Sequence, residues 1–227
     1  MEGMEKVRTC LVIGAAPLRH GEDLRRLYHP GDFVVCADGG LELAQKWGIQ
    51  PDLAVGDFDS FHGDIPGDLP VVPLNPHKDD TDMLAAVNAG LAHGCRRFLL
   101  ACGLGGRLDH SYANLCVLHH LHSLGYEAAL YGDGEEACLI GEGETRELFC
   151  GTGTTVSVFP FACGVCNVSY TGMRYPLDHH DLFSDIAVLP MGVSNVAEKM
   201  PCSVTVHSGL ALVLCTPDPD AVSRAEE

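Results

Sequence analysis

The pattern of the chain changes near residue 131, and this change constrains the fold more than any other feature. Before it, apolar segments such as Thr9–Gly14 and Asp32–Gly40 alternate with segments of helical periodicity such as Asp80–His93. After it, short β-branched runs follow one another, separated by glycine and proline. Alternating strands and helices indicate a parallel α/β sheet, and strands alone indicate a sandwich or small barrel. We predict an α/β domain over residues 1–133 and a smaller all-β sandwich over residues 134–227.

A strong excess of acidic side chains limits the ligands that the chain can bind. Lys and Arg number 14 against 31 Asp and Glu, which gives a formal net charge of −17. Nucleic-acid binding requires basic side chains that neutralise phosphates, so this composition argues against it. A phosphate compound would need a divalent cation as mediator, whereas a cationic ligand would be attracted directly. No apolar run reaches the roughly 20 residues of a membrane span, so we expect no membrane insertion.

The eleven cysteines do not suggest a disulfide framework, because their number is odd and many lie inside apolar runs. The opening "MEGMEKVRTC" is charged and lacks the apolar segment of a secretory leader. Cys163 and Cys166 have C-x-x-C spacing, but a zinc site needs two further ligands and the sequence has no second such pair. We predict reduced cysteines that fill the core, and a cytoplasmic location.

Acidic residues recur where strands of the first half should end. The carboxyl ends of parallel strands and the turns that follow them form the ligand crevice of open α/β sheets. The acids at these positions are therefore expected to converge: Asp38, Asp57, Asp59, Asp79, Asp80, Asp82 and Asp109. In an extended segment Asp57 and Asp59 would point the same way, with Cα atoms about 6–7 Å apart. Such a pair can hold Mg²⁺, or Asp59 can merely cap a turn. The pair alone does not decide between these interpretations.

The segment "KDDTD" places three acids next to Lys78, at the start of the helix that should run to His93. Asp79 and Asp82 are expected on one face of the first turn, and Leu84, Val87 and Leu91 on the buried face. Acids favour helix starts through capping and the helix dipole. One acid would satisfy that need, so three favour a functional role.

The segment "GLGGRLDH" is a glycine-rich turn from a strand into a helix. Such turns let backbone amides approach a phosphate, and Arg107 within it would be a natural phosphate clamp. Gly39 and Gly40 in "ADGG" offer a second, similar cradle. By contrast, the histidines of "LDHHD" (177–181) are expected to lie in an exposed polar loop, because adjacent histidines rarely bind one ion.

Taken in order, "CADGG", "VGDFDS", "KDDTD", "GGRLDH" and "YTGMRYPL…GVSN" resemble the thiamine pyrophosphokinase family in its bacterial form. The resemblance spans roughly Thr9 to Leu214. It implies an α/β nucleotide domain that binds ATP and Mg²⁺, followed by a β-sandwich that binds thiamine and forms a homodimer with the active site at the subunit interface. It also implies transfer of the pyrophosphoryl group of ATP to the hydroxyl of thiamine, with release of AMP.

The resemblance also assigns site residues by motif. It implies metal ligation by Asp57, Asp59 and Asp82, with Arg107 completing the catalytic set. Nucleotide and substrate contacts are implied for Asp38, Gly39, Gly40, Lys78, Arg107, Asp109, His110, Ser194 and Asn195, and Asp79 matches the second acidic cluster. Either Asp59 or Asp82 could accept the proton of the hydroxyl. Two alternatives remain open: a phosphatase with Asp57 as its nucleophile, and a sensor of thiamine or its diphosphate that does not catalyse.

Overall fold

The computed structural model describes residues 7–19, 21–58, 61, 63–75, 81–148, 150–185 and 192–217. The chain divides into two compact units, Met1–Gly134 and Glu135–Glu227, here called the α/β unit and the β unit. The expected boundary, between residues 133 and 134, lies one residue from the observed one. Each unit is a continuous stretch of the chain.

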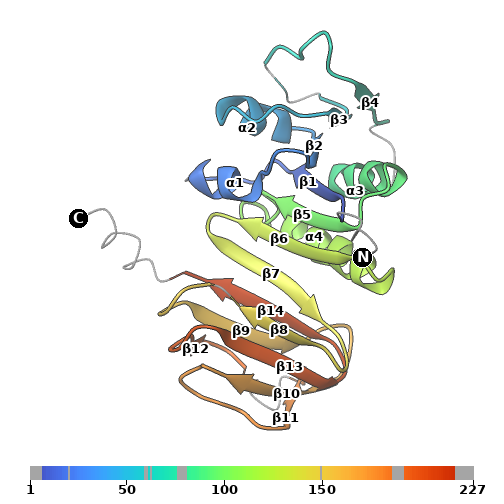
Figure 1. Cartoon of the computed structure of the whole chain (residues 1–227). Coiled ribbons are helices and arrows are strands. Elements are labelled where there is room, and N and C mark those ends of the chain that lie inside the picture. Colours follow the sequence, from blue (N-terminus) through green and yellow to red (C-terminus); the bar gives the residue numbers. More distant parts are fainter. Residues whose placement is uncertain are drawn as a thin grey trace, which may run out of the picture. The chain divides into compact units, whose positions relative to one another are not determined.

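The α/β unit has a parallel sheet with the strand order β6-β5-β1-β2-β3-β4 (Figure 1). Its elements are β1 (Thr9–Ile13), α1 (Gly21–Leu27), β2 (Phe33–Ala37), α2 (Gly40–Lys46), β3 (Leu53–Gly56), β4 (Val71–Pro73), α3 (Asp82–Ala92), β5 (Arg97–Ala101), α4 (Leu108–Ser123) and β6 (Glu127–Gly132). Because the strands are parallel and α1, α2 and α4 each join two neighbouring strands, the predicted fold class is confirmed for this half.

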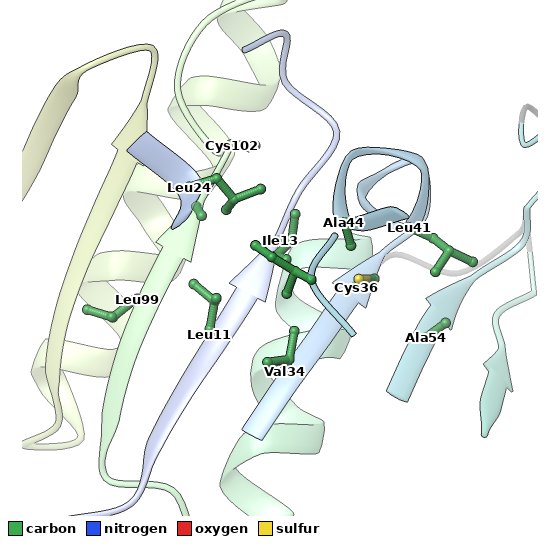
Figure 2. Close-up of a cluster of buried hydrophobic side chains, with 12 residues drawn as sticks. Leu11, Ile13, Leu24, Val34, Cys36, Leu41, Ala44, Ala54, Leu99 and Cys102 are labelled. Atoms are coloured by element: carbon green, nitrogen blue, oxygen red, sulfur yellow. The ribbon is translucent and has the colours of Figure 1, made fainter. Parts of the chain in front are cut away.

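Both faces of this sheet are covered, which explains why its strands are apolar on both sides. On one face, Leu24 of α1 and Leu41 of α2 pack over Leu11, Ile13 and the neighbouring strand residues (Figure 2). On the other face, α3 approaches so closely that a Cβ on Gly90 would lie 2.7 Å from the sulfur of Cys10 and 2.8 Å from the ring of Phe98. Small residues of α3 therefore permit this contact.

The buried face of α3 differs from the predicted one. Met83, Ala86, Val87 and Gly90 are buried, whereas Leu84 and Leu91 are only partly so. The leucines were expected inside because they are large and apolar. Because helix and sheet lie so close together, alanine and glycine fit at the closest contact, and the leucines lie toward the edge of the interface.

The β unit consists of two antiparallel sheets packed as a sandwich, as predicted. One has the order β12-β9-β14-β7 and the other β11-β10-β13-β8. The strands are β7 (Glu135–Ile140), β8 (Thr145–Leu148), β9 (Thr155–Pro160), β10 (Val165–Thr171), β11 (His180–Phe183), β12 (Asn195–Val196), β13 (Cys202–Ser208) and β14 (Ala211–Thr216). Alternate residues of β10 and β13 are buried between the sheets.

Part of the expected loop "LDHHD" is a strand. His180 and Asp181 belong to β11, and Asp181 lies opposite Asn167 of β10, whose side-chain amide donates to its carboxylate at 2.6 Å. Leu182 is the single buried side chain of this strand. One inward-facing apolar residue among polar neighbours explains why the sequence pattern resembled a loop.

All eleven cysteines are free thiols, and most are buried, which confirms the prediction that they fill the core. Within the part of the chain that the structure describes, no helix is both long enough and apolar enough to cross a membrane.

Candidate active site

The ends of neighbouring strands bring Asp38 and Asp57 together. Asp38 follows β2, and its amide donates to the carbonyl of Val55 in β3 at 2.8 Å. A Cβ on Gly56 would lie 2.9 Å from the Cα of Asp38, so the end of β3 passes directly against that residue. Asp57 comes next in the chain. The predicted convergence of these two acids at the carboxyl edge of the sheet is therefore present.

The start of α3 adds Asp82 to this acidic cluster. Burial raises the pKa of the Asp82 carboxyl, and the charges of Asp38 and Asp57 raise it further, whereas His110 at the start of α4 lowers it. Thr81 is the N-cap of α3, because its hydroxyl accepts a hydrogen bond from the amide of Leu84 at 3.2 Å. Helix capping thus does not require Asp82, which weakens the purely structural interpretation of this acid.

Asp38 has the least favourable position in the acidic cluster. Its backbone is left-handed, with φ at 45°. Its Oδ1 atom is buried and has no hydrogen-bond partner among the described residues. Because a buried carboxylate oxygen without a partner is costly, this atom is suited to a ligand that comes from outside the chain.

The stretch around Asp57 is not the extended segment that the sequence suggested. β3 ends at Gly56, and Phe58 has a left-handed backbone with φ at 53°. The backbone is therefore not extended at Phe58, and the predicted orientation of Asp59 lies outside the described residues. The side chain of Phe58 packs against the core cluster and lies edge-on to Phe61, with ring centroids 6.3 Å apart.

Several predicted residues lie outside the described residues: Asp59, Lys78 and Asp79. Among the residues that are described, no three His, Cys, Asp or Glu side chains form a ready-made metal site. The donor chemistry of the acidic cluster nevertheless fits a hard divalent cation. Carboxylate oxygens are the ligands that Mg²⁺ prefers, and a cation would relieve both the orphaned oxygen of Asp38 and the repulsion that raises the pKa of Asp82.

Packing inside the protein accounts for part of the glycine content of the turn "GLGGRLDH". A Cβ on Gly103 would lie 2.3 Å from Leu130, and the Gly103 amide donates to the carbonyl of Tyr131 at 3.0 Å. The amide of Gly105 donates to the hydroxyl of Ser111 at 3.2 Å. Two amides of the predicted phosphate cradle are thus engaged within the protein. Gly40 has a similar explanation, because a Cβ there would lie 1.9 Å from the carbonyl oxygen of Ile13.

Arg107 and Asp109 form an exposed ion pair at the start of α4. The guanidinium donates to both carboxylate oxygens of Asp109, with Nε at 3.1 Å from Oδ1. These hydrogen bonds lower the pKa of Asp109 and raise that of Arg107. To hold a phosphate, Arg107 would exchange this carboxylate for phosphate oxygens, which its planar guanidinium can bind through two parallel hydrogen bonds in the same way.

In the β unit, Ser194 and Asn195 have different environments. Asn195 is buried, its Oδ1 accepts from the amides of Tyr175 and Val196, and its Nδ2 donates to the carbonyl of Tyr175 at 2.8 Å. Its side chain therefore holds the chain at Tyr175 and is not displayed to a ligand. Ser194 is exposed, with φ at 59°. Tyr175, within the "MRYPL" run, is 63% exposed and received no role from the sequence, because a single aromatic residue carries no distinctive signal.

Comparison with known families identifies the α/β unit. Residues 24–130 match the family model described as thiamin pyrophosphokinase, catalytic domain. The match contains the acidic cluster and Arg107. No curated protein sequence matches the chain. The resemblance inferred from the motifs is thus confirmed, and with it the enzyme class.

Solved structures of this family share the fold. The thiamine pyrophosphokinase of Bacillus subtilis superposes with a TM-score of 0.81 at 20% identity, covering 93% of this chain and 100% of that one. That of Geobacillus thermodenitrificans gives 0.75 at 23% identity, with 93% and 98% covered. That of Candida albicans gives 0.71 at 13% identity, with 93% and 90% covered. Family and fold together support thiamine pyrophosphokinase activity.

Proposed function

We propose that the protein transfers the pyrophosphoryl group of ATP to the hydroxyl of thiamine, because residues 24–130 of its α/β unit match the family model of the thiamin pyrophosphokinase catalytic domain. The observation that carries the proposal is the meeting of Asp38 and Asp57 at the carboxyl ends of β2 and β3, where the Oδ1 atom of Asp38 is buried and has no hydrogen-bond partner among the described residues. A cluster of like charges is unfavourable on its own, and binding of a cation together with a polyphosphate would stabilise it.

The reaction breaks one bond and forms one. The thiamine hydroxyl oxygen attacks the β-phosphorus, the bond from that phosphorus to the oxygen bridging it to the α-phosphorus breaks, and AMP leaves with that oxygen. Catalysis consists mainly of positioning and charge neutralisation. Bound Mg²⁺ would neutralise charge along the phosphates. Asp38, Asp57 and Asp82 would supply oxygen ligands for it, and Asp59 is a further predicted ligand.

Other residues of the site would bind phosphate and move the proton. Arg107 would release Asp109 and hold a phosphate oxygen. Either Asp59 or Asp82 would accept the proton of the thiamine hydroxyl, as the sequence already predicted. In the β unit, exposed Ser194 and Tyr175 would contact thiamine, and Asn195 would position Tyr175. The cationic thiazolium ring suits a chain with a net charge of −17.

The test is turnover with defined products. The purified chain is incubated with ATP, MgCl₂ and thiamine, and AMP and thiamine diphosphate are quantified together. Equal amounts of both products are expected, with none when Mg²⁺ is chelated. An adduct of a phosphate mimic on the Asp57 carboxylate would instead indicate the phosphatase alternative. Thiamine binding without AMP formation would indicate a sensor. The predicted homodimer is checked separately by sedimentation equilibrium.

A further inference from the structure

A serine and two histidines meet on the second sheet of the β unit, where β11, β10 and β13 are neighbours (Figure 1). The Oγ atom of Ser169, on β10, lies 2.7 Å from Nε2 of His207, on β13. The imidazole rings of His207 and His179 are stacked, with centroids 3.8 Å apart and planes inclined by 13°. Nδ1 of His179 in turn lies 2.8 Å from Oδ1 of Asp178. These four residues are here called the Ser169 cluster.

The backbone departs from regular structure at both histidines of the Ser169 cluster. The register of β10 and β13 shifts here, and His207 is the extra residue on β13 between the paired Val206 and Ser208. His179 has a left-handed backbone, with φ at 47°. β-Bulges re-aim side chains and are frequent beside active sites, and left-handed residues other than glycine also concentrate at functional sites. Two local irregularities, and not regular strand pairing, therefore bring the two rings together.

The hydrogen-bond lengths indicate which way the hydroxyl of Ser169 points. The amide of His179 donates to Oγ at 2.9 Å and so occupies one lone pair of this oxygen. Two acceptors compete for the hydroxyl hydrogen: Nε2 of His207 at 2.7 Å and Oδ1 of Asp178 at 3.5 Å. Because 3.5 Å is long for a bond between oxygens, the hydrogen goes to Nε2, and Nδ1 of His207 then carries the ring hydrogen. A hydroxyl that donates to a basic nitrogen is the arrangement of an activated nucleophile.

The Ser169 cluster is held by the sheet and yet is open to solvent. Val168 and Tyr170, on either side of Ser169, are buried between the sheets, so their strand is fixed and Ser169 faces outward. The stacked ring of His179 orients the ring of His207, as a third group orients the base beside a nucleophile. The side chains of Asp178 and His179 are 92% and 68% exposed. A small molecule can therefore approach the cluster from their side.

A metal site is the less suitable interpretation of the Ser169 cluster. Over the part of the chain that the structure describes, no three His, Cys, Asp or Glu side chains are placed to hold an ion. The lone pair of an imidazole nitrogen lies in the plane of the ring, so two nearly parallel rings cannot aim theirs at one ion. Binding through Nε2 of His207 would also break its hydrogen bond with Ser169. Nucleophilic chemistry requires no such rearrangement.

We propose that Ser169 is a nucleophile with His207 as its general base, and that it accepts the acyl group of small carboxylic esters. Oγ of Ser169 attacks the carbonyl carbon of the ester while its proton passes to Nε2 of His207. The bond from that carbon to the alcohol oxygen then breaks, and the imidazolium of His207 returns the proton to the leaving alcohol. The product is an acyl-serine, from which water, activated by the same nitrogen, releases the carboxylic acid.

An alkyl fluorophosphonate is the first probe, because an activated serine displaces its fluoride and forms a stable adduct. The unmodified full chain is labelled and digested, and the modified residue is located by peptide mass spectrometry. One adduct per chain is expected, on Ser169. Ser169→Ala should abolish it, and His207→Gln should slow labelling at least about 100-fold, the usual contribution of a general base. No adduct, an adduct confined to another residue, or labelling of His207→Gln at the full rate would overturn the proposal.

Ser203→Ala is the matched control. Ser203 lies on β13 of the same sheet, and its hydroxyl pairs with that of Thr171 at 2.7 Å instead of with a histidine. This variant should be labelled on Ser169 at the rate of the unmodified chain. Phenyl acetate is the second probe, and it should leave an acetyl group on the peptide that contains Ser169. A chain that takes the fluorophosphonate on Ser169 but no acetyl group would exclude carboxylic esters as substrates.

Two variants of His179 test whether its ring positions His207. His179→Phe keeps a ring that can stack and should retain most of the labelling by the fluorophosphonate, whereas His179→Ala should lose most of it. Thermal unfolding of both variants checks that each is folded. Equal labelling rates in the two folded variants would exclude the positioning role of the stacked ring.

Discussion

At the scale of single residues, the acidic cluster contains groups whose positions are energetically unfavourable for the folded chain. Asp38 combines a left-handed backbone with a buried, unpartnered carboxylate oxygen, and Asp82 has a raised pKa beside two further acids. Strain and like-charge repulsion of this kind persist where function requires them. The residues that bind and react are therefore expected to be those whose neutralisation leaves the fold intact.

Asp57→Asn tests this expectation. The variant should keep its unfolding temperature or raise it, because one of three repelling carboxylates is neutralised. It should also lose at least about 100-fold in Mg²⁺-dependent AMP release, the order of effect of removing one electrostatic contact in an active site. The matched control is Asp68→Asn, an exposed acid outside the acidic cluster, which should retain full activity. Normal turnover by Asp57→Asn would remove the metal-site hypothesis.

The pH dependence of Cys150 labelling is a second residue-scale prediction. Because the pKa of Cys150 lies at about 6, its thiolate is present above that pH and is lost by protonation below it. Iodoacetamide labelling of Cys150, followed by peptide mass spectrometry, should therefore reach its plateau near pH 7. Cys215→Ala should move the midpoint toward the ordinary value of 9.0, further than Cys202→Ala does, because Cys215 is the group that lowers the pKa of Cys150 most. A midpoint unchanged in both variants would contradict this.

At the scale of elements, the helices and strands with many apolar residues could be predicted from the sequence. Short elements that form only through contact with a neighbouring element could not. The strands and long helices of the α/β unit were recognisable from periodicity. α1 was not predicted, because it has seven residues and only Gly21 and Leu24 are buried. β12 is two residues long and exists through its pairing with β9. The acids of the site were found by their position at strand ends, whereas the left-handed turn at Phe58 has no sequence signal.

The contact between α2 and β1 should not tolerate an added methyl group. Gly40→Ala would place its Cβ 1.9 Å from the carbonyl oxygen of Ile13, which is backbone and cannot move aside. We expect a loss of about 3 kcal/mol in the free energy of unfolding, measured with urea. Gly67→Ala is the control, because a Cβ there meets no atom within 4 Å. Equal stability of the two variants would show that α2 shifts freely over the sheet.

The two residues of the "GVSN" motif should behave differently on substitution. Asn195→Ala breaks the hydrogen bonds to Tyr175 and Val196 and should lower the free energy of unfolding by about 2 kcal/mol. Ser194→Ala removes an exposed hydroxyl and should raise the KM for thiamine without changing stability. Urea unfolding and steady-state kinetics on both variants separate the roles. A stable Asn195→Ala variant with a raised KM would assign direct binding to the amide.

At the scale of the whole molecule, the net charge of −17 opposes compactness, and salt should relieve it. The unfolding temperature should rise with NaCl, and it should rise further with MgCl₂ at equal ionic strength if the acidic cluster binds the ion. Thermal scans of the chain and of Asp57→Asn separate the two effects. The variant should keep the response to NaCl and lose the additional response to MgCl₂. Identical responses in both proteins would mean that Mg²⁺ acts only by general screening.

The continuity of the two units in the chain has a consequence for biosynthesis. The acids of the cluster and Arg107 lie within the first 107 residues, and the parallel sheet is complete with β6 at Gly132. Domains tend to fold as units, N-terminal first, while the ribosome is still translating. The α/β unit can therefore gather its carboxylates before the first strand of the β unit has left the exit tunnel, and the β unit is completed only as the remaining codons are translated.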